Sequence, residues 1–147
     1  MTTTEAKRPV HLHWRFIGIV AAGGVVGALS RYALGLVIPA PGAWPLPTLL
    51  INLSGALALG ALLEGLSRRG PDVGNRRVLR LALGTGYLGA YTTYSTLAMD
   101  AVHLFSAGSA PAAAAYLAAS LLGGAVATTA GIWLGAWHHR RAVGRPS

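Results

Sequence analysis

The sequence contains no cysteine, and only four of its 147 residues are acidic. The lack of cysteine excludes disulfides, thiolate metal sites and cysteine nucleophiles. The acids are too scattered to form a buried carboxylate pair, and no Ser/His/Asp set or metal-ligand cluster is present. The sequence therefore offers no recognisable set of catalytic groups. We expect a protein that is not an enzyme and has no catalytic residue.

Charge of either sign is also rare, because only 11% of the residues are charged and 53% are hydrophobic. Four segments are nearly free of charge: 16–38, 46–63, 81–99 and 112–137. Each approaches or exceeds the ~20 residues that a helix needs to cross a bilayer. A soluble alanine-rich bundle is the alternative, but it needs polar helix faces, and these segments offer almost none.

The sequence therefore predicts an all-α membrane protein with four transmembrane helices in one domain. The predicted parts are a basic N-terminal tail, the transmembrane domain and a basic C-terminal tail, at 1–15, 16–137 and 138–147. The lipid bilayer is then a partner of the whole domain, and the protein is a multi-pass protein of the inner (plasma) membrane.

The net charge of +8 comes from twelve lysines and arginines, and their placement is uneven. Eleven of them lie before the first segment, around the link between the second and third, or after the fourth. With four spans, all eleven fall on one side of the membrane, so the positive-inside rule predicts that both termini are cytoplasmic. The basic charge is then an orientation signal, and we expect no nucleic-acid partner.

The third segment contains an unusual stretch, GTGYLGAYTTYSTL (84–97), which combines glycines with threonines, serine and tyrosines. This mixture predicts a helix that breaks near Gly89 and exposes backbone carbonyls and hydroxyls. Irregular backbone at membrane depth persists only where protein buries it or a cavity lines it. Carbonyls at the break suit a bound cation, whereas hydroxyl donors suit a small anion that loses its water.

Two further polar residues interrupt the apolar segments. Arg31 either extends to the nearer interface or lines an aqueous vestibule that attracts an anion. Asn52 makes a hydrogen bond between packed helices or belongs to a wet face. The neutral donors inside the segments are Asn52, Thr92, Thr93, Tyr94, Ser95, Thr96, Tyr116 and Ser120. No membrane carboxylate accompanies them, which disfavours a proton-coupled exporter of the small multidrug type.

Three motifs resemble the CrcB/Fluc family of fluoride channels. GGVVGALSRY (23–32) is similar to the family pattern GGxxGAxxRY, and PTLLINLSG (47–55) to (G/P)TLxxNxxG. GYLGAYTTYSTL (86–97) is similar to GfxGgxTTFSTF. The motifs agree in order and spacing, and the resemblance covers about 16–137.

The resemblance implies an antiparallel dimer of four-helix subunits, with the third helix broken mid-span and narrow fluoride pores. It implies a structural sodium ion held by the main-chain carbonyls of Gly89 and Thr92, and a vestibule arginine at Arg31. The residues that match the fluoride path are Asn52, Tyr94, Ser95, Thr96, Tyr116 and Ser120. The expected function is passive export of fluoride from the cytoplasm, which reduces its toxicity.

The sequence departs from the family pattern at two phenylalanine positions, which are Tyr94 and Leu97 here, and Ala90 replaces a glycine. The one-sided charge also disfavours insertion in both orientations. We therefore hypothesise that the chain pairs with an oppositely oriented homologous subunit. The alternatives are a non-conducting partner subunit of such a heterodimer and a secondary exporter of a small cation.

Overall fold

The structure is a computed structural model that describes residues 13–42 and 44–143. Its regular elements are α1 (Trp14–Val37), α2 (Leu46–Ser67), α3 (Asn75–Leu79), the π-helix η2 (Arg80–Leu88), α4 (Gly89–Tyr91), α5 (Tyr94–Ser106) and α6 (Ala110–Val143). Within the described part of the chain there is no strand, which confirms the all-α prediction. Most of the predicted N-terminal tail (1–15) and the last residues of the predicted C-terminal tail (138–147) lie outside the described residues.

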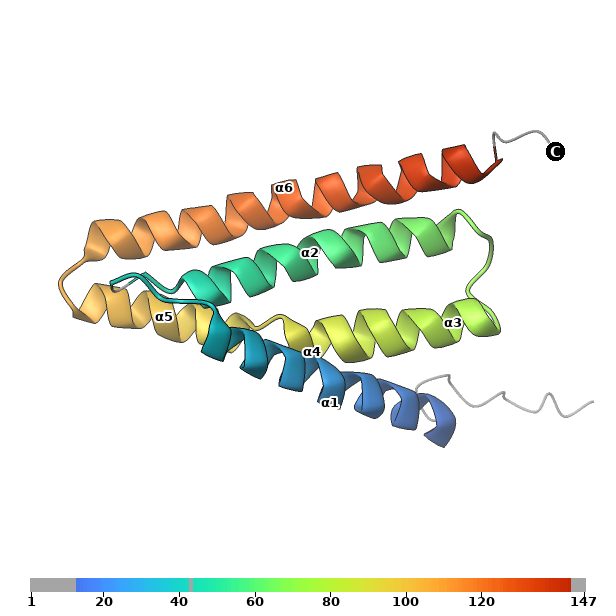
Figure 1. The fold of residues 1–147 in the computed structure, drawn as a ribbon, viewed down its shortest axis with the longest axis horizontal. Helices are drawn as coiled ribbons and strands as arrows, with labels where there is room; N and C mark the ends of the chain where they lie inside the picture. Colours follow the sequence, from blue (N-terminus) through green and yellow to red (C-terminus); the bar gives the residue numbers. More distant parts are fainter. Residues whose placement is uncertain (1–12, 43, 144–147) are drawn as a thin grey trace, which may run out of the picture.

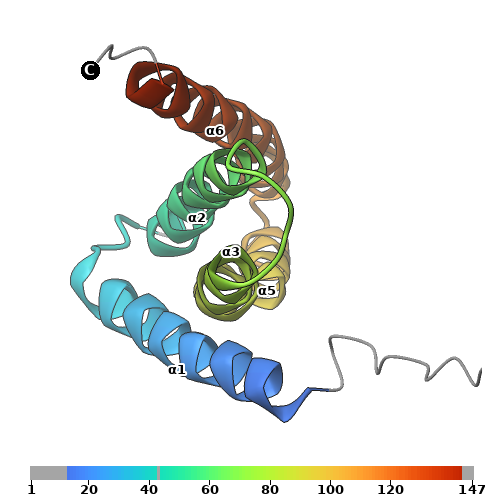
Figure 2. The same ribbon diagram turned by 90° about the vertical axis from the view of Figure 1, so that its right-hand side faces the viewer.

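The helices are arranged side by side along one long axis (Figure 1). The beginning of α1, the connection from α2 to α3 and the end of α6 lie at the same end of the molecule. A view down the axis places α2 next to α6, and α1 on the opposite side of the molecule from α6 (Figure 2). The main packing pairs are α2 with α6 and α1 with η2. The segment from α3 to α5 therefore lies between α1 and the α2–α6 pair.

Three of the described helices, α1, α2 and α6, are long and apolar enough to cross a membrane. Their outer surfaces carry large exposed apolar side chains, such as Leu36 on α1 and Leu121 on α6. Such a surface suits a lipid environment, whereas a water-soluble protein rarely exposes large continuous apolar patches. The predicted third span (81–99) instead falls in the divided segment from α3 to α5.

Glycines allow the helices to approach closely at both main packing pairs. A Cβ atom at Gly27 of α1 would overlap the Tyr87 carbonyl oxygen of η2, and one at Gly86 would lie 2.6 Å from the Val20 carbonyl oxygen. On the other side, a Cβ at Gly60 of α2 would lie 2.5 Å from the Thr128 carbonyl oxygen of α6. Small residues in such positions let helix backbones touch, which is a main source of packing energy in lipid.

The break in the third segment lies at Thr92–Thr93, so the predicted break near Gly89 is displaced along the chain. Gly89 is helical, with φ −64° and ψ −31°. Thr92 (φ −78°, ψ 157°) and Thr93 (φ −147°, ψ 120°) are extended. Because any residue adopts these angles, the interruption does not depend on glycine and needs another cause.

The connection between α2 and α3 is anchored by Asp72. Its carboxylate accepts a hydrogen bond from Arg80 Nη2 at 2.7 Å and lies 3.7 Å from Arg77 Nε. The hydrogen bond from Arg80 holds the pKa of the Asp72 carboxyl below its ordinary value, because it stabilises the charged form. The start of the third segment is therefore tied to the turn that precedes it.

Candidate functional site

Asn52 of α2 forms both hydrogen bonds that the extended backbone at Thr93 requires. Its Nδ2 donates to the Thr93 carbonyl oxygen at 3.0 Å, and its Oδ1 accepts from the Thr93 N–H at 2.8 Å. The side-chain amide thus pairs with the backbone as a neighbouring strand would. An unpaired backbone group away from water costs about as much free energy as a lost hydrogen bond. By pairing both groups of Thr93, Asn52 removes this cost and allows the helix to be interrupted inside an apolar bundle.

Thr93 also begins the helix that follows the break. Its Oγ1 accepts a hydrogen bond from the Thr96 N–H at 3.2 Å and donates one to Thr96 Oγ1 at 3.0 Å. The Ser95 hydroxyl lies 3.2 Å from the same oxygen. This is an N-cap, in which a side-chain oxygen satisfies an N–H group that the first turn of a helix leaves free. Thr93 therefore ends the extended stretch and positions the hydroxyls of Ser95 and Thr96.

We expect Thr93→Val to destabilise the protein by about 1 kcal/mol, because valine keeps the shape of threonine but cannot cap α5. The measurement is the free energy of unfolding in detergent. Thr129→Val is the matched control, since the Thr129 hydroxyl donates only to the Ala125 carbonyl of its own helix. An equal loss in both variants would argue against the capping role.

α2 also contacts the residues immediately before the break. A Cβ atom at Gly55 would overlap the Thr92 side-chain methyl group, so the backbone of α2 lies directly against the Thr92 side chain. The hydroxyls of Ser54 and Tyr91 are 3.0 Å apart, and the Tyr91 ring stacks on Tyr87 with their centroids 5.7 Å apart. The motif 47–55 thus serves as the support for the broken segment.

Arg31 reaches the break from α1. Its Nη1 lies 3.5 Å from the Thr92 carbonyl oxygen, at the limit of a hydrogen bond. Among the described residues it has no acidic partner. The two interpretations made from the sequence were an interfacial position and a vestibule. The structure places the guanidinium against the backbone of the break, where it contributes positive charge.

The carbonyls of Gly89 and Thr92 both lose their usual donors. In an uninterrupted α-helix these oxygens would accept from the N–H groups of Thr93 and Thr96. Here the Thr93 N–H bonds to Asn52, and the Thr96 N–H bonds to the Thr93 hydroxyl. Main-chain oxygens freed in this way are suitable ligands for a hard cation such as sodium. The residues present therefore fit the expected ion.

The predicted fluoride-path residues fall into two groups. Asn52, Ser95 and Thr96 lie at the break, where Ser95 and Thr96 are exposed and Tyr94 is 82% exposed. Tyr116 and Ser120 instead lie on α6, where both are buried. The hydrogen bonds of the described residues do not join the two groups.

Asp100 of α5 lies beside the α6 group. It directly follows the predicted third segment, 81–99, and α5 continues through it to Ser106. Its Oδ2 lies 3.4 Å from the Tyr116 hydroxyl, which donates to it. The buried Ser120 Oγ has no hydrogen-bond partner within the described chain. Asp100 follows Thr96 by four residues, and this helical spacing would have placed both on one side of α5.

The ring of Tyr116 is fully buried and meets Trp44 edge-on, with centroids 6.1 Å apart. Leu97 packs against the same cluster, together with Leu53. Leu97, which occupies a family phenylalanine position, thus lies next to the α6 group. Tyr94, at the other such position, is directed away from the chain's own core.

Residues 18–132 match the family described as CrcB-like protein, Camphor Resistance (CrcB). A protein named fluoride-specific ion channel FluC 2 from Leifsonia xyli is 45% identical over 128 residues, which cover 87% of this chain and 88% of the relative. Two proteins from Moorella thermoacetica are also similar. Its FluC 1 is 43% identical, covering 78% of this chain and 81% of the relative, and its FluC 2 is 42% identical, covering 84% and 95%.

Proposed function

Because the chain belongs to the CrcB-like family, we propose that it is a subunit of a fluoride-specific ion channel that exports fluoride passively from the cytoplasm. The observation that carries this proposal is the helix break held by Asn52. It brings hydroxyls, freed carbonyls and a guanidinium together in an otherwise apolar bundle. Conduction requires donors that replace the water of the ion without binding it too tightly, and neutral hydroxyls and amides meet that requirement.

In this proposal the chain crosses the inner membrane four times, with both termini in the cytoplasm. α1, α2 and α6 supply three passages, and the divided segment from α3 to α5 supplies the remaining one. Its interruption at membrane depth is supported by the hydrogen bonds from Asn52, as irregular backbone in a bilayer requires.

We propose that a second subunit covers the outer side of the break in an antiparallel dimer. Tyr94 is largely exposed, and Ser95 and Thr96 are exposed beside it. Hydroxyls facing hydrocarbon would lack partners, which is costly. A partner subunit would enclose them and complete a narrow path for fluoride. Arg31 would attract the anion towards it, whereas Asp100 would repel anions near Tyr116.

A structural sodium ion would be held at the same break by the carbonyls of Gly89 and Thr92. Arg31 already approaches the Thr92 carbonyl, so the guanidinium and the ion would share that oxygen. The ion would contribute fixed positive charge and would stiffen the backbone beside the fluoride path.

The partner is proposed to be a homologous subunit of opposite orientation. Eleven of the twelve basic residues lie on one predicted side of the membrane, which favours a single orientation for this chain. Relatives named FluC 1 and FluC 2 occur together in Moorella thermoacetica, so two such chains coexist in at least one organism. A non-conducting role within the heterodimer is the second candidate, and it is favoured by Leu97, which supplies no aromatic ring.

We expect topology reporters fused to the C-terminus to give signal only on the cytoplasmic side when the chain is expressed alone. The physical reason is the preference of basic loops for that side. Neutralising Arg68, Arg69, Arg76 and Arg77 together leaves seven basic residues on the same predicted side, so the signal should remain cytoplasmic. Comparable signal on both sides for the unchanged chain would remove the argument for an oppositely oriented homologue.

The proposed function is tested by anion efflux from liposomes that contain the purified chain, alone or with a homologous subunit. Fluoride should leave, while chloride at the same concentration should stay. Fluoride efflux only in the presence of the homologue would support a heterodimer. A chain that carries no fluoride in either preparation would refute the channel proposal.

A further inference from the structure

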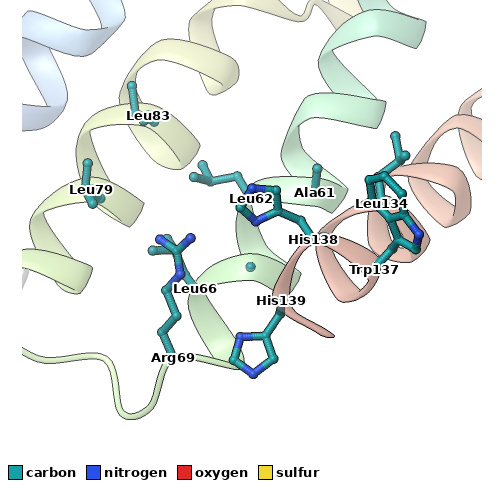
Figure 3. Close-up of a pocket in the computed structure, with 12 residues that line it drawn as sticks. Ala61, Leu62, Leu66, Arg69, Leu79, Leu83, Leu134, Trp137, His138 and His139 are labelled. Carbon is teal, nitrogen blue, oxygen red and sulfur yellow. The ribbon is translucent and has the colours of Figure 1, made fainter. Parts of the chain in front are cut away.

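A pocket of about 510 Å³ lies away from the helix break, between the end of α2, the segment around α3 and η2, and the end of α6 (Figure 3). Its volume is within the range of small-ligand sites, about 300–1,000 Å³. Most of the residues that line it are apolar, and the larger ones are Leu62, Leu66, Leu79, Leu83 and Leu134. Leu79 and Leu83 are partly exposed, so the apolar wall continues to the outer surface.

The polar part of the pocket is basic. Arg69 lies just after the end of α2. Figure 3 shows its guanidinium between Leu79 and Leu83 on one side and the histidines of α6 on the other. His138 and His139 come from the end of α6. No acidic side chain is among the described residues that line the pocket. The pocket therefore combines an apolar wall with donors that suit a phosphate group.

The position of the pocket agrees with this chemistry. It lies at the end of the bundle where α2 ends and α6 ends, the end that carries most of the basic residues. Trp137 also lines it, and the Arg141 guanidinium lies 3.8 Å from the centre of the Trp137 ring. Tryptophan and arginine together are typical of the interface between hydrocarbon and headgroups. Basic pockets between helices at the cytoplasmic side are suited to anionic lipid headgroups.

We propose that this pocket binds an anionic phospholipid of the cytoplasmic leaflet. The headgroup phosphate lies against Arg69 and the two histidines, and one acyl chain lies along Leu79 and Leu83. The lipid then joins the ends of α2 and α6 to the start of the broken segment. This proposal requires that the helices cross a bilayer, but it does not require fluoride conduction, so either can fail without the other.

The test is lipid binding to the full chain, purified and delipidated in detergent, with the bound fraction measured by native mass spectrometry. Phosphatidylglycerol and phosphatidylcholine with identical acyl chains are the probes. Phosphatidylglycerol should bind at least about fivefold more tightly, the ratio that corresponds to ~1 kcal/mol per basic residue near an anionic surface. Arg69→Gln should weaken its binding by about fivefold. Arg15→Gln is the matched control, because Arg15 is exposed on α1 and does not line the pocket.

A second pair of variants tests the apolar wall. Leu83→Trp would fill the space proposed for the acyl chain and should weaken phosphatidylglycerol binding severalfold. Leu121→Trp, at an exposed position on α6 outside the pocket, should leave it unchanged. Equal binding of both lipids, or equal effects of Arg69→Gln and Arg15→Gln, would overturn the proposal. Competition by inorganic phosphate at concentrations equal to the lipid would also overturn it, because it would indicate a site for soluble anions.

Discussion

Asn52→Ala is expected to lower fluoride efflux from liposomes by at least about a hundredfold. The substitution leaves the Thr93 N–H and carbonyl without their partners at the break. Each unsatisfied buried group costs about 1–3 kcal/mol, and a loss of about 3 kcal/mol lowers the equilibrium ratio of intact to disrupted break by roughly a hundredfold. The measurement is the initial efflux rate per reconstituted subunit, together with the free energy of unfolding.

The sequence offers a control for this prediction in the second asparagine. Asn75 is exposed at the first turn of α3, so Asn75→Ala should change neither quantity appreciably. Asn52→Asp tests the two hydrogen bonds separately, because it keeps the acceptor for the Thr93 N–H but loses the donor to the Thr93 carbonyl oxygen. It should fold better than Asn52→Ala but conduct poorly, since a carboxylate repels fluoride. Full conduction by Asn52→Ala would show that the break is held by other means.

Gly27→Val is expected to destabilise the protein by about 3 kcal/mol, the upper part of the usual range for overpacking. A Cβ atom at Gly27 would overlap the Tyr87 carbonyl oxygen, and a backbone atom of a neighbouring helix cannot move aside as a flexible side chain can. α1 would have to separate from η2, and Arg31 would then lose its contact with the Thr92 carbonyl. The free energy of unfolding in detergent measures the effect, and fluoride efflux should fall with it.

Gly18→Val is the control for this packing prediction. Gly18 lies on the same helix, and a Cβ atom there would meet nothing within 4 Å. The substitution therefore carries the same cost in helix propensity without the overlap. If both variants lost stability equally, the close approach of α1 to η2 would not be the cause. The loss would then come from the low helix propensity of valine.

Much of this architecture could be predicted from the sequence, because the relevant patterns are local. Long uncharged runs predicted the apolar helices. Asn52 was expected either to make a hydrogen bond between packed helices or to belong to a wet face, and it makes hydrogen bonds to the backbone at the break. The family assignment, made from three motifs, is confirmed by the match over residues 18–132.

The features that sequence reasoning missed depend on contacts between distant segments. The break lies at Thr92–Thr93 instead of Gly89, because α2 delivers the hydrogen-bonding side chain opposite Thr93. The π-helix Arg80–Leu88 was not predicted, and α1 approaches it closely at Gly86. Asp100 lies just beyond the predicted third segment, 81–99. It is accommodated within α5, where the Tyr116 hydroxyl donates to it.

Fluoride efflux from potassium-fluoride-loaded liposomes, with and without the potassium carrier valinomycin, distinguishes a passive fluoride pore from a coupled exporter. A passive fluoride pore moves net charge, so efflux should be slow until valinomycin lets potassium follow, and a proton gradient should not be needed. We expect rapid fluoride loss on adding valinomycin, which Asn52→Ala strongly reduces, and no such loss of chloride. Fluoride loss that is independent of valinomycin and driven by a proton gradient would contradict it, because it would indicate a coupled exporter.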